Sequence, residues 1–213
     1  MRVCLASTSP ARLTLLRQAG IEPETMAPDV DEDAVIAAVQ HDEARTLPAA
    51  EHVLLLARRK AADVAERVAA AGFEGIVIGG DSMFEIDGEI LGKPYTAEAA
   101  VARWRAMRGR TGILHSGHSV VRVGGGRAEA EAHGVAEASV TFAADITDDE
   151  IAAYVATGEP LHVAGAFTID SLGGPFIDTV HGDPSTVVGM SLPTVRRLAR
   201  QLDVAWPTLW NRS

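Results

Sequence analysis

The chain has 213 residues, with 19 basic and 29 acidic side chains and a formal net charge of −10 at pH 7. This balance argues against a general nucleic-acid binder, because such proteins owe most of their affinity to the neutralisation of phosphates. Apolar residues make up 47% of the chain and aromatic residues only 5%, so we expect a globular fold with a core of Ala, Val, Leu and Ile.

Cysteine content and apolar runs bear on the compartment. The single cysteine, Cys4, excludes an internal disulfide framework, and its place in an apolar run predicts a buried side chain in a reducing environment. No apolar run approaches the ~18 residues of a membrane span, and the one after Met1-Arg2 is too short for a signal peptide. We therefore expect a cytoplasmic protein without membrane association.

The first 72 residues predict a strand and two helices. Residues 3–6 form a short apolar strand, and Ser9 with Pro10 marks the start of a helix that stops at Gly20. Apolar residues recur at helical spacing over residues 50–71, which predicts a second, longer helix.

The middle of the chain predicts strands around one helix. Residues 76–78 form a continuous apolar run, typical of a buried strand, which places Asp81 just past the carboxyl end of that strand. Residues 84–91 predict a hairpin that turns at Asp87-Gly88, and Thr96 caps the helix that follows.

The last part of the chain continues this alternation. Residues 113–123 and 137–143 predict strands joined by a glycine-rich turn. Thr147 and Glu150 form a capping box for the next helix, and a final helix is expected near residues 192–202. Because crossovers and hairpins are mixed, we expect an α/β fold with a mixed β-sheet flanked by helices. No linker or repeat interrupts the chain, so we expect one domain over residues 1–213.

The turn before the first helix is a candidate phosphate site. Ser7 and Arg12 flank a helix N-terminus, where exposed backbone N–H groups and the helix dipole favour an anion. In the alternative interpretation, Ser9 merely caps the helix and Arg12 is a solvated side chain.

Lys60 lies on the apolar stripe of the long predicted helix, in line with Val53 and Val64. A cation that points toward the core needs an anionic partner. The alternative is a lysine at the edge of this face whose ammonium group reaches water.

Asp81 is a candidate for metal binding or for the activation of a water. An aspartate beside two glycines at the end of a strand leaves room for a ligand, and its oxygens suit a hard cation such as magnesium. It could equally be an ordinary turn aspartate. Residues 31–33 could supply a second carboxylate, although acidic clusters are more often solvated loops.

The other polar motifs give weaker signals. Gly92-Lys93-Pro94 lacks the spacing and the hydroxyl of a Walker A loop, yet Lys93 could bind phosphate as a point charge. His115 and His118 are three residues apart in a predicted strand, so they face opposite sides and are not expected to bind zinc together. The chain also lacks a nucleophile-elbow sequence. The remaining groups suit metal-assisted attack of water on a phosphoric anhydride.

Several short segments, taken in order, resemble the Maf family from end to end. They are LASTSPAR (5–12), DE (31–32), KA (60–61), GGDS (79–82), LGKP (91–94), GEP (158–160), AGAF (164–167), GD (182–183) and VG (188–189). The resemblance implies a nucleoside triphosphate pyrophosphatase, which uses water and a divalent cation, Mg²⁺ or Mn²⁺, to release a nucleoside monophosphate and pyrophosphate. It also implies an elongated α/β fold with two lobes around a cleft, similar to inosine triphosphate pyrophosphatases and commonly homodimeric.

The resemblance also assigns roles by position. It implies that Asp81 is the catalytic proton acceptor and a metal ligand, and that Glu32 is the second carboxylate on the metal side. The phosphate ligands that it implies are Ser7, Arg12, Lys60 and Lys93.

Three positions leave the preferred base open. The pyrimidine-triphosphate branch of the family has arginine, threonine and glutamine there, and the 7-methyl-GTP branch has tryptophan, glutamine and glutamate; this chain has Ala11, Ser82 and Asp170. Asp170 could accept hydrogen bonds from a base or could be a turn aspartate. The leading hypothesis is an enzyme that hydrolyses modified or non-canonical triphosphates.

Two other functions remain open from the sequence. The family's association with septum formation allows a nucleotide-binding regulator of cell division with little turnover, and a phosphomonoesterase would release orthophosphate first. The 19 basic residues are seventeen arginines and only two lysines, Lys60 and Lys93. Both lie on motifs to which the resemblance assigns phosphate binding. If a compact ammonium is needed there, Lys60→Arg and Lys93→Arg should each impair turnover.

Overall fold

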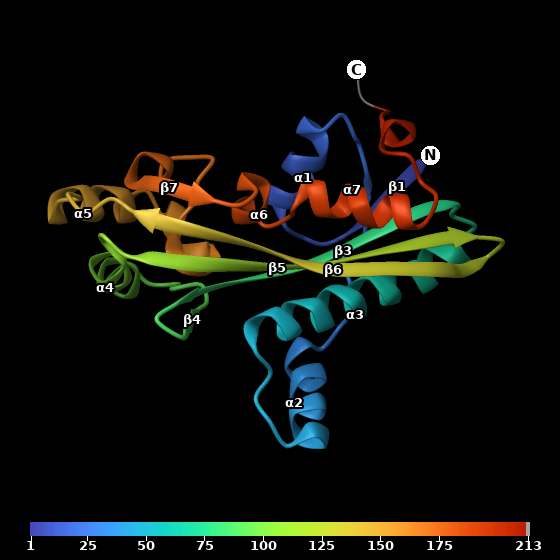
Figure 1. The fold of residues 1–213 in the computed structure, drawn as a ribbon, viewed down its shortest axis with the longest axis horizontal. Helices are drawn as coiled ribbons and strands as arrows, with labels where there is room; N and C mark the ends of the chain where they lie inside the picture. Colours follow the sequence, from blue (N-terminus) through green and yellow to red (C-terminus); the bar gives the residue numbers. More distant parts are fainter. Residues whose placement is uncertain (212–213) are drawn as a thin grey trace. The chain divides into compact units, whose positions relative to one another are not determined.

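The computed structural model describes residues 1–211 and contains one mixed seven-stranded β-sheet flanked by helices (Figure 1). The strand order is β2-β1-β3-β5-β6-β7, and β4 pairs with β3 outside this path. The strands are β1 (Arg2–Ala6), β2 (Glu24–Thr25), β3 (Gly75–Ile86), β4 (Glu89–Leu91), β5 (Thr111–Gly124), β6 (Arg127–Phe142) and β7 (Ile177–His181). β1 pairs in parallel with β2 and β3, whereas β3–β4 and β6–β7 are antiparallel. The predicted mixed sheet is confirmed.

The chain forms two compact units. The first contains Met1–Asp81, Ser116–Ala136 and the segment from Gly189 onward, and the second contains Ser82–His115 and Glu137–Val188. The strands β3, β5 and β6 each contribute residues to both units. The expectation of a single domain over the whole chain stays a prediction.

In the first unit, helix α3 (Ala49–Ala70) covers one face of the strands, and α1 (Pro10–Gln18) and α7 (Leu192–Gln201) lie on the other side (Figure 1). The sequence forms α3 because its buried positions recur at alternating steps of three and one, which gives one continuous face. These positions are Val53, Leu56, Ala57, Lys60, Ala61, Val64, Ala65, Val68 and Ala69. Small alanines in this face allow the helix to approach the strands closely.

Two glycines mark where α3 touches the sheet. A Cβ on Gly79 in β3 would lie 2.4 Å from the carbonyl oxygen of Ala57, and a Cβ on Gly117 in β5 would lie 2.2 Å from that of Val53. Neither position has space for a side chain, so the helix backbone rests directly on the strand backbones. This contact fixes how far along β3 each residue of α3 lies.

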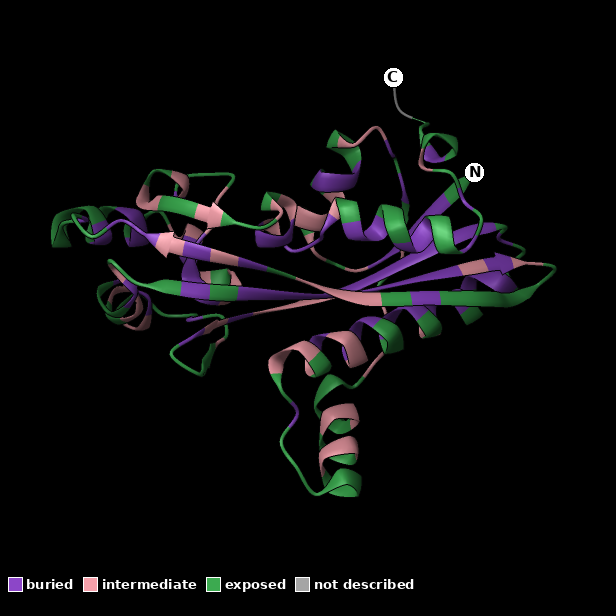
Figure 2. Cartoon of the chain, viewed as in Figure 1, coloured by how far each residue is buried: buried purple, intermediate pink, exposed green. Residues whose placement is uncertain are grey.

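Helix α2 (Glu32–Glu43) follows the acidic segment and was not predicted. Asp31 caps it by accepting a hydrogen bond from Ala34 N at 3.0 Å, and Glu32 and Asp33 lie in its first turn, where the helix dipole favours negative charge. None of its residues is buried, as Figure 2 shows. Because no face of α2 is buried, its sequence does not show the helical spacing of apolar residues that predicts a helix.

The second unit has its own core of aromatic and aliphatic side chains. Helices α4 (Ala97–Met107) and α5 (Asp148–Ala156) pack around Trp104, which is fully buried and donates a hydrogen bond to Ala166 O at 2.8 Å. Its ring meets Phe142 and Tyr154 edge to face. The predicted hairpin is confirmed, with Phe84 opposite Leu91, and so is the capping box of α5.

Several predicted strand limits were wrong. β3 extends to Ile86, so Asp81 lies inside a strand and not beyond its end. β6 begins at Arg127 and not at residue 137, because the ladder with β5 continues up to the glycine turn although the residues there are exposed. β7 and the two-residue β2 were missed, because half-exposed edge strands carry little apolar pattern.

Cys4 is buried, as predicted, and burial raises the pKa of its thiol to about 11. Of the described helices, none has both the length and the apolar character that a membrane span requires.

Candidate active site

The side chains of Glu32, Lys60 and Asp81 meet in the first unit. Lys60 Nζ lies 2.8 Å from Asp81 Oδ1 and 2.8 Å from Glu32 Oε1. The side chains of Lys60 and Asp81 are 9% and 14% exposed, whereas that of Glu32 is 49% exposed. The site is therefore a largely buried ion pair with one carboxylate at its open side, and the expectation that Lys60 needs an anionic partner is confirmed.

The local fold places each of the three groups. Lys60 belongs to the buried face of α3, one turn after Ala57, whose carbonyl lies against Gly79. Side chains two residues apart on a strand share a face, so Asp81 is on the same face as Gly79. The parallel pairing of β1 with β3 ends at Ala6 opposite Gly79, so Asp81 lies just past the end of β1. Asp81 is therefore in the middle of its own strand, β3, but just beyond the carboxyl end of the neighbouring strand, β1.

Glu32 reaches the site as the first residue of α2. The cap formed by Asp31 fixes this end of the helix, and contacts between α2 and α3 hold the pair of helices together. The acidic segment, which could have been a solvated loop, thus contributes one cap and one ion-pair partner.

Ser7 and Arg12 come together at the turn between β1 and α1. Arg12 Nη1 donates to Ser7 Oγ at 3.2 Å and Arg12 Nε donates to Gly189 O at 2.8 Å. Ser9 caps α1 by accepting a hydrogen bond from Arg12 N at 3.4 Å. Ser9 therefore has the structural role of the alternative interpretation, but the solvated Arg12 of that interpretation was wrong.

Arg12 also lies next to Asp81 along β3. A Cβ on Gly80 would lie 3.3 Å from Arg12 Nε, so the guanidinium rests against the residue that precedes Asp81. Burial lowers the pKa of Arg12, and the negative charges of Asp81 and Glu32 act in the opposite direction. An arginine keeps its charge under such a shift, so the site contains two cations and two carboxylates.

His52 near the start of α3 was missed by the sequence analysis. Burial lowers the pKa of its imidazole; Asp81 and Glu32 raise it, and Lys60 lowers it. The neutral form of the imidazole is therefore favoured, and His52 lies within electrostatic range of all three groups. Its only sequence signal was its place in the helix that carries Lys60.

The carboxylates fit a hard cation whose shell is completed by substrate. Within residues 1–211, no group of three or more His, Cys, Asp or Glu side chains is arranged to hold a metal ion. Mg²⁺ usually takes one or two carboxylates together with substrate phosphates and waters, and Asp81 with Glu32 supplies this number. Both carboxylates now contact the ammonium of Lys60, so they already converge on one positive charge.

The other predicted site residues belong to the second unit, apart from Ala11, which lies in the first turn of α1. Ser82 is the residue of β3 directly after Asp81, and Lys93 is an exposed residue after β4. Asp170 is exposed, in a bend between two short 3₁₀ helices.

The segment that carries Asp170 is held by Glu159, which the sequence analysis did not single out by chemistry. Its carboxylate accepts hydrogen bonds from the side chains of Tyr154, Thr168 and Ser171 and from the backbone N–H groups of Leu172 and Gly173. Burial alone would raise the pKa of Glu159, but the hydrogen bonds from Thr168, Ser171 and Tyr154 outweigh it and leave the pKa below its usual value.

His115 and His118 lie in different units and contact different groups. His115 lies in the second unit, with Nδ1 3.0 Å from Glu137 Oε1 and Nε2 3.1 Å from Glu85 Oε2. His118 lies in the first unit and accepts a hydrogen bond from Ser191 N at 2.8 Å. Both are buried structural groups.

Comparison with known families shows which family the chain belongs to. The family model described as Maf-like protein matches residues 2–202. The chain belongs to the Maf-like family. The match spans all the segments from which the resemblance was inferred, and Ser7, Arg12, Glu32, Lys60 and Asp81 all lie in the first unit.

Curated Maf-like relatives match over the full length. A protein of Leifsonia xyli subsp. xyli is 57% identical over 100% of this chain and 98% of its own length. Proteins of Rhodococcus jostii and Streptomyces coelicolor are 51% and 50% identical, and each match covers 98% of this chain and 96% and 94% of the relatives. All three are named nucleoside triphosphate pyrophosphatase.

Among solved structures, that of the Staphylococcus aureus Ham1 protein matches with a TM-score of 0.36 and 12% identity, over 68% of this chain and 73% of that chain. A TM-score of 0.36 is too low to establish a shared fold. The predicted similarity to inosine triphosphate pyrophosphatases therefore stays a prediction.

Proposed function

We propose that this chain is a nucleoside triphosphate pyrophosphatase, which converts a triphosphate and water into a nucleoside monophosphate and pyrophosphate. The observation that carries the proposal is the convergence of Glu32, Lys60 and Asp81, with Arg12 beside them, in a family whose curated members bear this name. Cations stabilise the charge that develops on the leaving pyrophosphate, and a carboxylate accepts a proton from water.

Each residue has a proposed role. Asp81 Oδ1 accepts a hydrogen bond from Lys60, and within residues 1–211 no donor reaches Oδ2, which leaves that oxygen to take the proton of the attacking water. Lys60 orients the carboxylate and, once substrate is bound, offers its remaining N–H groups to phosphate. Ser7 and Arg12 bind a second part of the triphosphate at the start of α1, where the helix dipole also favours an anion.

Glu32 and Asp81 would hold the divalent cation, Mg²⁺ or Mn²⁺. Such a cation supplies Lewis-acid stabilisation of phosphate charge when bound. Lys60, which contacts both carboxylates, offsets part of their negative charge before the substrate arrives.

The proposal extends to the second unit for base selection. We propose that Lys93 contributes a phosphate contact and that Asp170, with Ser82 and Ala11, affects the choice of base. Asp170 accepts hydrogen bonds only, so it would favour a base that presents an N–H or amino group. Modified or non-canonical triphosphates fit this proposal; the homodimer and the cytoplasmic location stay predictions.

The activity is tested with a panel of canonical, methylated and deaminated triphosphates, with pyrophosphate and orthophosphate measured separately. We expect pyrophosphate as the first product, with a divalent cation required. Orthophosphate as the first product would indicate a phosphomonoesterase. Nucleotide binding without turnover of any substrate in the panel would instead favour the regulator of cell division.

A further inference from the structure

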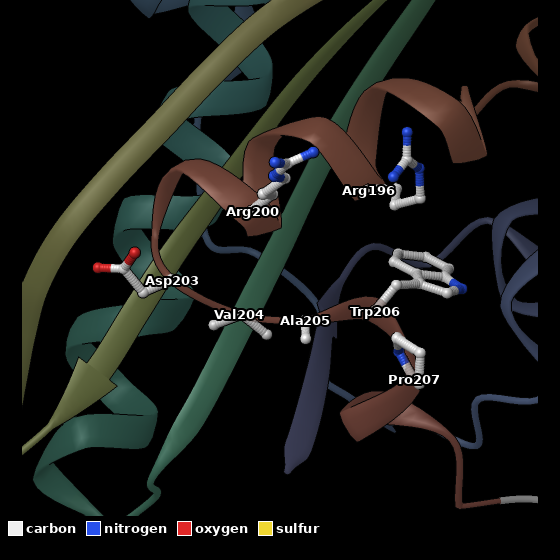
Figure 3. Close-up of a pocket in the computed structure, with 7 residues that line it drawn as sticks. All are labelled: Arg196, Arg200, Asp203, Val204, Ala205, Trp206 and Pro207. Atoms are coloured by element: carbon white, nitrogen blue, oxygen red, sulfur yellow. The ribbon is translucent and has the colours of Figure 1, made fainter.

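The end of the first unit contains a pocket that the proposed function does not use. It lies between the outer side of α7 and the turn into the 3₁₀ helix η4 (Trp206–Leu209), and its volume is about 600 Å³ (Figure 3). Small-molecule sites usually have volumes of about 300–1,000 Å³. The lining residues are Arg196, Arg200, Asp203, Val204, Ala205, Trp206 and Pro207.

Two arginines give the pocket its positive charge. Arg196 and Arg200 are four residues apart on α7, so their side chains share one face of the helix. Within the described chain, neither guanidinium makes a hydrogen bond or an ion pair with protein. Four other arginines of this unit are paired with carboxylates, in Arg2–Glu24, Arg17–Glu22, Arg58–Glu131 and Arg122–Glu129. In a chain with net charge −10, two unpaired arginines in one pocket favour an anionic ligand.

Trp206 gives the pocket a flat apolar wall. Its side chain is half-buried, Pro207 follows it within η4, and the neighbouring Val204 is buried. Figure 3 shows the Trp206 indole on the side of the pocket where Arg196 lies. The Asp203 carboxylate points away from the indole. An accessible indole face can stack with a planar ring, as aromatic side chains do with bases in single-stranded nucleic-acid complexes.

We propose that this pocket is an accessory nucleotide site, with the base against Trp206 and the phosphate bound by Arg196 and Arg200. Guanidinium groups bind phosphate through paired hydrogen bonds, and a nucleotide combines a phosphate with a planar ring. The pocket uses no residue of the Glu32–Lys60–Asp81 group, and nucleotide binding there needs no turnover. The inference therefore goes beyond the pyrophosphatase proposal and does not depend on it.

Adenosine 5′-monophosphate is the probe, and calorimetric titration of the full chain measures its stoichiometry and affinity. We expect the double variant Arg196→Ala/Arg200→Ala to lose one equivalent of bound nucleotide relative to the wild type, and to keep the wild-type pyrophosphatase rate. Arg127→Ala/Arg197→Ala removes the same charge from exposed positions outside the pocket and should bind as the wild type does. Unchanged stoichiometry and affinity in the first double variant would overturn the proposal.

The role of the base is tested with fragments of the same probe. Ribose 5-phosphate and adenosine should each bind this pocket at least about tenfold more weakly than the intact nucleotide, because each lacks one of the two contacts. Trp206→Phe should keep the site and Trp206→Ala should weaken it. If ribose 5-phosphate binds as tightly as the nucleotide, or if Trp206→Ala binds as the wild type does, the pocket is not a nucleotide site.

Discussion

Lys60 Nζ and Asp81 Oδ1 lie 2.8 Å apart, between the buried face of α3 and the middle of β3. The pair is possible because Gly79, two residues before Asp81, lets the backbone of α3 rest on the strand. Glu32 meets the same ammonium from the capped end of α2. One lysine thus joins α2, α3 and β3 of the first unit.

Loss of the Lys60 charge should destabilise the fold. Lys60→Met leaves the mostly buried Asp81 carboxylate without its partner, and breaking a buried ion pair on one side costs about 3 kcal/mol or more. Urea denaturation in EDTA measures the free energy of unfolding. Arg17→Met, which breaks the exposed pair with Glu22, should cost less than about 1 kcal/mol. Equal effects of the two substitutions would contradict the buried-pair interpretation.

The substitution Lys60→Arg keeps the positive charge of the side chain but changes its shape. The planar guanidinium is larger than the ammonium, and the lysine lies on a face packed between Ala57 and Ala61. We expect pyrophosphate release to fall at least about tenfold although the charge is kept. A wild-type rate in Lys60→Arg would show that the choice of lysine at this position is accidental.

The structure changes the expectation for Lys93. This residue is exposed after β4, so a guanidinium has room there, and the argument from a tight site does not apply. We now expect Lys93→Arg to keep most of the activity and Lys93→Ala to raise KM through loss of a phosphate contact. Lys93→Ala with unchanged KM and kcat would remove Lys93 from the proposed site.

Gly79→Ala tests the contact between α3 and β3. The added Cβ would lie 2.4 Å from Ala57 O and 2.7 Å from Ala61 Cβ, so the helix must move. We expect a loss of about 1–3 kcal/mol in the free energy of unfolding together with reduced activity, because Lys60 and Asp81 separate. At Gly134 the nearest atom to an added Cβ is Leu198 Cδ2 at 3.8 Å, so Gly134→Ala serves as the control.

Glu159 should make stability depend on acid pH. Its folded-state pKa is lowered from the ordinary value of 4.5, so its hydrogen bonds stabilise the fold fully above that value. This stabilisation is lost as the pH falls below 4.5 through the folded-state pKa. The stability difference between the wild type and Glu159→Gln, measured by urea denaturation, should therefore shrink on acidification. Glu74→Gln, at an exposed position, should show no such trend.

The sequence predicted those parts of the fold that have a strong local signal. The spacing of buried residues in α3, the Ser9 and Thr96 caps and the turn at Asp87-Gly88 each act within a few residues, and all are confirmed. Helix α2 escaped prediction because it buries no residue, and β7 because it lies at the edge of the sheet. Their existence depends on tertiary contacts that no local pattern reveals.

The candidate site was predicted in its residues but not in its connections. The helical position of Lys60 required a partner, yet its pairing with both Asp81 and Glu32 depends on the close approach at Gly79, which joins segments distant in the sequence. The contact of Arg12 with Gly189 also joins segments that are distant in the sequence. His52 had no local signal and became visible only through its charged neighbours.

The measurement that tests the central claim most directly is pyrophosphate release by Asp81→Asn and Asp63→Asn. Asp63 is a partly exposed aspartate of α3 that pairs with Arg67 and accepts a hydrogen bond from Asp29 N, so its loss matches the chemical change outside the site. We predict that Asp81→Asn lowers kcat by about 10²-fold or more with the fold intact, and that Asp63→Asn retains the wild-type rate. Undiminished pyrophosphate release by a folded Asp81→Asn would contradict the account.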